Sequence, residues 1–149
     1  MRYFLLGVIL ALTMASPAAA DAGLTAAVAA VYGQRTVDAG LHAIAHDRAQ
    51  EISSCGSCLN HDLMRPGTAE VLGYNSGHPN PTSAVISAWQ GSAAHNGILS
   101  DLALGRIGCA EVIVGGSHFF ACVLAAGGGQ TSAVDPPAPA AGLPDTAMR

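Results

Sequence analysis

The spacing of apolar positions changes along the chain, and its first half is typical of helices. An alanine-rich run, LTAAVAAVYGQR, spans Leu24–Arg35 and predicts a buried first helix. A second set of apolar residues recurs at helical spacing. Its members are Leu41, Ile44, Ala45, Ala49 and Ile52. Asp38 precedes this stripe and is a favoured N-cap residue, so a second helix is expected to begin there.

Two further helices are expected between residues 80 and 100. Asn80 is a good N-cap residue, and Pro81 fits the first helical position. The apolar residues that follow on one helical face are Val85, Ile86 and Trp89. Ser92 can cap a second, shorter helix, which places His95 in the first turn of that helix.

After residue 106 the pattern changes to two apolar, partly β-branched runs around a tight turn. Ile107–Val114 and Ser117–Ala125 flank Gly115-Gly116, a strong signal for a two-residue β-hairpin turn. Ala69–Gly77 is a shorter apolar piece that ends in turn residues.

This turn sets a register in which Val114 faces Ser117 and Cys109 faces Cys122. The cysteines then occupy a non-hydrogen-bonded pair with Cα atoms about 4.5 Å apart, within the range for a disulfide. A longer turn would shift the register by one residue and send the sulfurs to opposite faces. With the two-residue turn, the sequence predicts a Cys109–Cys122 bridge and leaves Cys55 to pair with Cys58.

The same register assigns the other hairpin residues to two faces of the sheet. Glu111, Phe120, Ile113 and His118 share the cysteine face. Ala110, Val112, Phe119 and Ala121 line the opposite face.

The segment 53–67, SSCGSCLNHDLMRPG, has the composition of a loop and contains a Cys-x-x-Cys motif. In thioredoxin-like sites this motif opens a helix, whose N-terminus lowers the thiol pKa. Here Cys55 and Cys58 follow a predicted helix. Covalent haem attachment needs a histidine directly after the second cysteine, where this chain has Leu59. A structural disulfide is therefore the favoured interpretation, with a thiol oxidoreductase as the alternative.

Composition excludes several classes of partner. The chain has 149 residues, which is typical of one domain with tails, and a net charge of −4. Only 11% of residues are charged, and all six basic residues are arginine. Without a basic stripe, neither nucleic acid nor an anionic membrane surface is an expected partner.

The N-terminus is typical of a secretory signal peptide. A short positive start, the apolar run Phe4–Met14 and Ala18-Ala19-Ala20 predict a signal peptide over residues 1–20, cleaved before Asp21. A membrane anchor is the alternative, but the apolar run is shorter than the about 20 residues that span a bilayer. The domain is expected at 21–126, followed by a disordered Gly/Pro/Ala-rich tail at 127–149. Export to the periplasm or the extracellular space favours disulfides over metal thiolates.

The second half of the chain resembles the CAP superfamily of cysteine-rich secretory, antigen 5 and pathogenesis-related proteins, in its short bacterial form. The residues that carry the resemblance are Trp89, Ser92, His95, Ile98-Leu99 and Ile107–Ala110. Two positions depart from the pattern, with Ala94 for the usual glycine and Gly97 for a common asparagine. The resemblance implies an α+β fold, an α–β–α sandwich with a small central antiparallel sheet.

The resemblance also implies a cleft formed by His61, Glu70 and His95. In relatives, two such histidines can hold a divalent metal such as zinc, so His61 and His95 are the candidate ligands. Glu70 could orient an imidazole or hold a metal-bound water. A second acidic residue, usual near the tryptophan helix, is missing here, and Val71 replaces the asparagine of the family's Glu-Asn segment. The same residues could equally form a hydrogen-bonded network that binds no metal.

Function follows less directly, because one fold serves many activities. The leading hypothesis is a monomeric binding or accessory module of the cell envelope or extracellular space. Its expected partner is a small apolar ligand or an envelope component. The alternative is a hydrolase that activates water on a metal between His61 and His95. No serine or cysteine nucleophile stands at recognisable spacing from a base, and the missing second acidic residue argues against strong catalysis.

The other histidines are expected at the surface. His42 and His46 are four residues apart and could share a metal from one helix face, but solvated positions are the simpler interpretation. His78, in a turn-rich segment, and His118, beside the hairpin turn, are expected to be surface residues as well.

Overall fold

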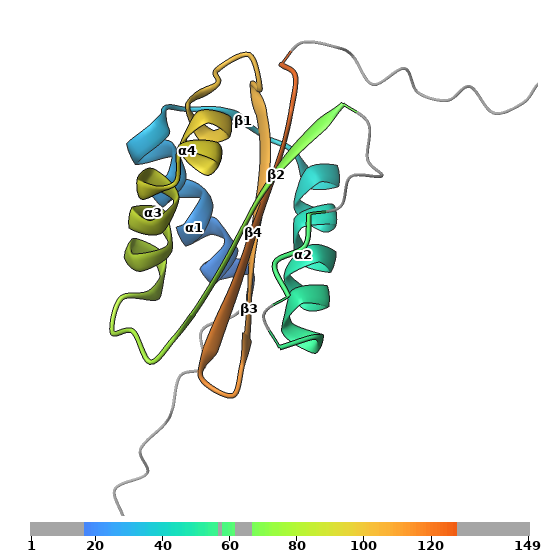
Figure 1. Cartoon of the computed structure of the whole chain (residues 1–149). Coiled ribbons are helices and arrows are strands. Elements are labelled where there is room, and N and C mark those ends of the chain that lie inside the picture. The colour runs from blue at the N-terminus through green and yellow to red at the C-terminus, as the bar shows by residue number, and fades with distance from the viewer. Residues whose placement is uncertain (1–16, 57, 62–66, 128–149) are drawn as a thin grey trace, which may run out of the picture.

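The computed structural model describes residues 17–56, 58–61 and 67–127. Within them, helices and strands follow one another in the order α1 (Pro17–Tyr32), β1 (Thr36–Val37), α2 (Ala39–Ser54), β2 (Thr68–Ser76), α3 (Pro81–Gly91), α4 (Ala93–Ser100), β3 (Arg106–Val114) and β4 (Ser117–Ala125). The strands form one sheet in the order β1-β3-β4-β2. Figure 1 shows α2 on one face of the sheet and α1, α3 and α4 on the other. The expected α–β–α sandwich is confirmed.

The sheet is mixed rather than purely antiparallel. β2, β4 and β3 are antiparallel neighbours, whereas β1 pairs in parallel with the start of β3. The Asp38 N–H donates to the Ile107 carbonyl at 2.9 Å, so the chain leaves β1 directly into α2 while still bonded to β3. This two-residue parallel edge is a correction to the predicted antiparallel sheet.

The C-terminal hairpin has the predicted register. Gly115 and Gly116 both adopt positive φ, 59° and 80°, as a tight primed turn requires. Val114 faces Ser117, and the Cys109–Cys122 disulfide joins Cα atoms 4.1 Å apart. The turn glycines therefore determine where the bridge forms.

Two apolar cores lie on the two faces of the sheet, as the alternation along the hairpin predicts. The core under α1, α3 and α4 includes Leu24, Val28, Trp89, Leu99, Cys109, Phe120 and Cys122. The core under α2 includes Leu41, Ala45, Ala49, Ile52, Ala110, Phe119 and Ala121. Trp89 Nε1 donates to the Leu72 carbonyl at 2.8 Å, which satisfies the polar atom of the largest fully buried side chain.

Gly108 allows α2 to approach β3 closely. A Cβ atom at this position would lie 2.0 Å from the His42 backbone nitrogen. The start of α2 therefore lies directly against the strand, and this approach brings the His42 side chain to the edge of β3.

Helix starts are only partly as predicted. Asp38 caps α2, because its carboxylate accepts from the Leu41 N–H at 2.9 Å. This hydrogen bond, helped by the positive charge of Arg106, holds the pKa of Asp38 below its usual value despite some desolvation. Asn80 and Ser92 occupy the predicted N-cap positions but make no side-chain capping bond.

The predicted signal peptide and tail lie mostly outside the described residues. α1 begins at Pro17, so this helix spans the cleavage site expected before Asp21. The signal peptide and the domain boundaries stay predictions. Within the described part of the chain, no helix is both long enough and apolar enough to cross a membrane.

Candidate functional site

The structure brings His61, Glu70 and His95 together, and we call these three residues the histidine site. His61 lies in the segment after α2, Glu70 on β2 and His95 in the first turn of α4. His61 Nδ1 lies 3.2 Å from Glu70 Oε1, and the His61 and His95 ring centroids are 5.9 Å apart. This is the grouping that the sequence resemblance implies.

The contact with Glu70 determines which His61 nitrogen is available to a ligand. A carboxylate accepts hydrogen bonds, so in the neutral imidazole Nδ1 carries the proton. The lone pair then lies on Nε2, the usual arrangement of a metal-binding histidine oriented by a carboxylate. Glu70 therefore orients His61 rather than serving as a third ligand.

His95 supplies the second imidazole. Burial lowers the pKa of His95, and the nearby charge of protonated His61 lowers it further. The ring is therefore favoured in its neutral form, which has a lone pair to offer. Two neutral imidazoles can hold a zinc-like ion if water or a bound ligand completes the coordination. No group of three or more His, Cys, Asp or Glu side chains suited to a metal occurs within the described residues.

Arg48 is a residue of this region that the sequence interpretation missed. Its side chain is only 5% exposed and its guanidinium forms an ion pair with Glu70, whose side chain is 10% exposed. Burial on its own lowers the pKa of Arg48, but the hydrogen bonds and charges of Glu70 and Glu51 outweigh it and raise the pKa. The sequence does contain a signal for a buried Arg48, because helical spacing places it on the same face as Leu41, Ala45 and Ile52.

His42 lies at the surface, with its side chain 39% exposed, but its ring also makes specific contacts that the sequence does not predict. Its Nδ1 lies 2.8 Å from the Cys109 carbonyl oxygen, and its Nε2 lies 3.4 Å from Asp21 Oδ2. Asp21 is buried and also accepts from the Glu111 N–H at 2.8 Å. These contacts form because α2 approaches β3 closely enough for the ring to reach the backbone. His46 is exposed, as expected.

His118 is misassigned by the sequence. Its Nδ1 lies 2.5 Å from Glu111 Oε1, and its side chain is 19% exposed. The ring stacks near Phe120, with centroids 6.1 Å apart. The reason is the sheet face, since Glu111, Phe120 and His118 all project from the cysteine side of the hairpin. His78 is exposed, as expected.

A cavity of about 500 Å³ lies apart from the histidine site, between α1, β1 and the start of α2. Asp21 and His42 line one part of it, and Val28, Val37 and Ile107 are among its apolar residues. The cavity and the histidine site are therefore separate features of this molecule.

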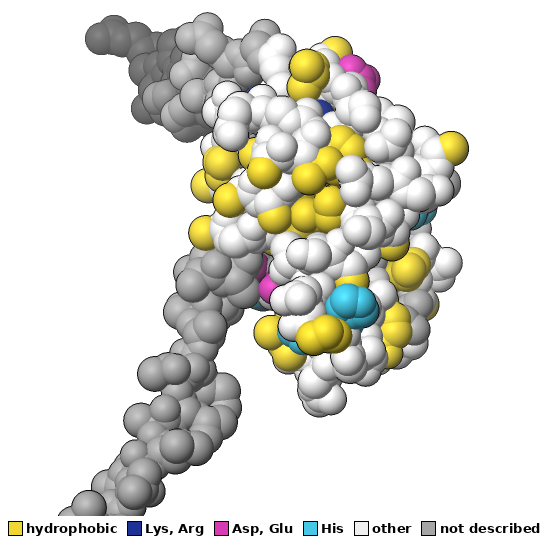
Figure 2. Space-filling view, turned by 90° about the vertical axis from the view of Figure 1, so that its left-hand side faces the viewer, with side chains coloured by type: hydrophobic (Ala, Val, Ile, Leu, Met, Phe, Trp, Pro, Cys, Tyr) yellow, Lys and Arg dark blue, Asp and Glu magenta, His cyan; other side chains and the backbone are white. Residues whose placement is uncertain are grey.

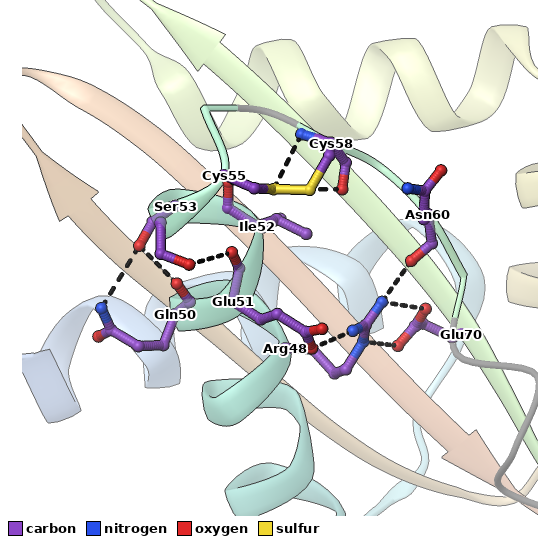
Figure 3. Close-up of a disulfide and its surroundings, with 10 residues drawn as sticks. Arg48, Gln50, Glu51, Ile52, Ser53, Cys55, Cys58, Asn60 and Glu70 are labelled. Carbon is purple, nitrogen blue, oxygen red and sulfur yellow. Dashed lines mark hydrogen bonds and ion pairs between the residues drawn. A yellow bond between two sulfur atoms is a disulfide. The ribbon is translucent and has the colours of Figure 1, made fainter.

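The second disulfide joins Cys55 and Cys58 just after α2, with Cα atoms 5.7 Å apart (Figure 3). Its two cysteines lie at and after the C-terminus of the helix, where the helix dipole would not stabilise a thiolate if the bridge were reduced. Cys55 N–H still bonds to the Glu51 carbonyl, as the last helical turn requires. This setting favours a structural bond over a thioredoxin-like redox centre.

Comparisons with known proteins identify the fold. No family model and no curated protein matches the sequence. Among solved structures, an outer surface protein from Borrelia burgdorferi aligns with a TM-score of 0.59 and 17% identity, over 70% of this chain and 90% of that one. The fold is that of the CAP superfamily. A structure of NaASP2 with Zn²⁺ aligns over 68% of this chain and 72% of that one at 15% identity. The TM-score of that alignment is 0.43.

Proposed function

We propose that this chain is an exported CAP-fold binding module that takes a divalent metal such as zinc between His61 and His95. The observation that carries the proposal is the contact of His61 Nδ1 with Glu70 Oε1 at 3.2 Å. It directs the other ring nitrogen away from the carboxylate and leaves it available to a ligand. His95, with its lowered pKa, supplies the second nitrogen at neutral pH.

Export is part of the proposal and rests on the chain's chemistry. Residues 1–20 have the pattern of a signal peptide, and both disulfides need an oxidising compartment to persist. The face that carries α1, α3 and α4 presents hydrophobic side chains at its centre and few charged ones (Figure 2). Such a surface suits a small apolar ligand or an envelope component, which remains the predicted partner, as a monomer remains the predicted state.

Binding is favoured over hydrolysis because of what Glu70 already contacts. A general base must reach the attacking water with a carboxylate oxygen. Both Glu70 oxygens are within 3.5 Å of Arg48 or His61. A metal-dependent hydrolase using this site is the second candidate, and the experiment below separates the two.

The test is zinc titration of the exported protein by calorimetry, with melting curves. We expect one zinc ion per chain and a gain in stability of RT ln(1 + [Zn]/Kd), about 2.7 kcal/mol at a hundredfold excess over Kd. His61→Ala and His95→Ala should each lose affinity by at least about tenfold. His46→Ala is the matched control, because His46 is an exposed histidine outside the site.

Equal zinc responses in all four proteins would contradict the proposal and indicate surface binding. Zinc-dependent cleavage of an activated ester by the wild type, lost in His61→Ala and His95→Ala, would favour the hydrolase instead.

A further inference from the structure

Arg48 is the buried cation of α2, and its contacts are specific. The residue is 4% exposed on the face of α2 that packs on the sheet. A buried charge is tolerated only when its donors are matched by acceptors. Figure 3 shows the guanidinium between Glu70, Glu51 and the Asn60 carbonyl, with the Cys55–Cys58 disulfide above it.

Two of these three contacts lead directly to the histidine site. Arg48 Nε donates to Glu70 Oε2 at 2.7 Å, and Nη2 lies 3.4 Å from Glu70 Oε1. The same Nη2 donates to the carbonyl of Asn60, the residue directly before His61. One planar group therefore holds both the carboxylate that orients His61 and the backbone that carries it.

We propose that Arg48 is the positioning residue of the histidine site, placing Glu70 and His61 so that the His61 Nε2 lone pair is available to a divalent metal. The inference deepens the function proposed above and rests on it for the identity of the ligand. The placement itself is a property of the metal-free protein and can be measured separately.

The chemistry of the guanidinium explains why arginine suits this position. Its donors point in fixed directions, so they can hold a carboxylate and a carbonyl at the same time. Its permanent positive charge also pairs with the Glu70 carboxylate, which accepts a hydrogen bond from His61 Nδ1. A lysine would keep the positive charge but would lose the planar set of donors that holds the carboxylate and the carbonyl at the same time.

Glu51 provides a matched control. It pairs with Arg48 through Nη1 from the next turn of α2, but its own side chain is 65% exposed. An exposed ion pair contributes little. Glu51→Gln therefore removes the charge from one partner of Arg48 and leaves the two contacts to the histidine site in place.

The experiment compares wild type, Arg48→Lys, Arg48→Met and Glu51→Gln with two readouts. The first is the dissociation constant for Zn²⁺ alone, by calorimetry. We expect Arg48→Lys and Arg48→Met to weaken binding by about 10–100-fold, the effect typical of removing a residue that supports a ligand, and Glu51→Gln to change it by less than about fivefold. Circular dichroism establishes that each variant is folded, and Arg48→Lys decides the question if Arg48→Met does not fold.

The second readout is the tautomer of His61 in metal-free protein, from nitrogen-15 shifts of the ring. Wild type and Glu51→Gln should show the proton on Nδ1, and the folded Arg48 variants a mixture of tautomers. Folded Arg48 variants with wild-type zinc affinity and an unchanged tautomer would overturn the inference. If wild type binds no zinc, the proposed function fails, while the tautomer comparison still accepts or rejects the role of Arg48.

Discussion

The two disulfides of this chain lie in opposite kinds of surroundings. Cys109 and Cys122 are both fully buried, on adjacent strands whose pairing the turn glycines and the core already determine. Cys55 and Cys58 close a short exposed loop after α2. The first bridge reinforces a geometry that packing provides, whereas the second constrains a segment whose described residues are mostly exposed. In the second region, position depends on polar bonds, chiefly those of Arg48.

Removing the hairpin bridge should have the largest effect on stability. For Cys109→Ala with Cys122→Ala, loop-closure entropy predicts a loss of about 3 kcal/mol. The strand register should survive, because Gly115 and Gly116 still form the turn. Urea unfolding measures the loss, and cross-strand nuclear Overhauser contacts report the register. A shifted register in the folded variant would show that the bridge itself, rather than the turn, determines the pairing.

Removing the loop bridge should cost less stability but affect the histidine site more. Cys55→Ala with Cys58→Ala opens only a short loop, so the same relation predicts a loss of about 2 kcal/mol. Zinc affinity should fall further than in the hairpin variant, because His61 follows Cys58 by three residues. Calorimetry on both double variants makes the comparison. A greater loss of zinc affinity in the hairpin variant would contradict the view that the loop bridge, rather than the hairpin bridge, constrains the segment that carries His61.

Removing the N-cap of α2 should lower stability by less than removing either bridge. This cap lies away from both bridges. Asp38→Ala removes the N-cap bond to Leu41 and should cost about 1 kcal/mol at pH 7. Because the pKa of Asp38 is lower in the folded chain, its contribution is complete above the ordinary pKa of about 3.9 and is lost as the pH falls through the lowered value. The difference between wild type and variant should therefore shrink in acid. Denaturant melts at pH 7 and pH 3 check this, and a constant difference would mean that the charge of Asp38 contributes nothing.

The hairpin shows how much sequence can determine when the information is local. Gly115-Gly116 identifies the turn, the turn determines the register, and the register places Cys109 opposite Cys122. Asp38 is similarly predictable, since an N-cap residue bonds to a neighbour three positions along the chain. In both places the interacting groups are close in sequence or related by a two-residue period.

The polar contacts were harder to predict because they join distant parts of the chain. His42 contacts the Cys109 carbonyl, 67 residues away in the sequence, and Asp21 accepts from the Glu111 N–H, 90 residues away. Nothing in the spacing of histidines and acids indicates such contacts before the helix is placed on the sheet. Only the family resemblance predicts the histidine site. Arg48 was detectable in principle, as a charged residue on an apolar helical stripe.

The Asp21–His42 pair also occupies part of the exposed edge of the sheet. β1 covers only the start of β3, so within the described chain the following outward-facing backbone groups of β3 have no strand beside them. Unpaired groups at a sheet edge are a template for strand addition and aggregation. Here the Cys109 carbonyl is held by the imidazole and the Glu111 N–H by the carboxylate. An incoming strand would have to displace both side chains before it could bond to this edge, so the two residues act against strand addition there.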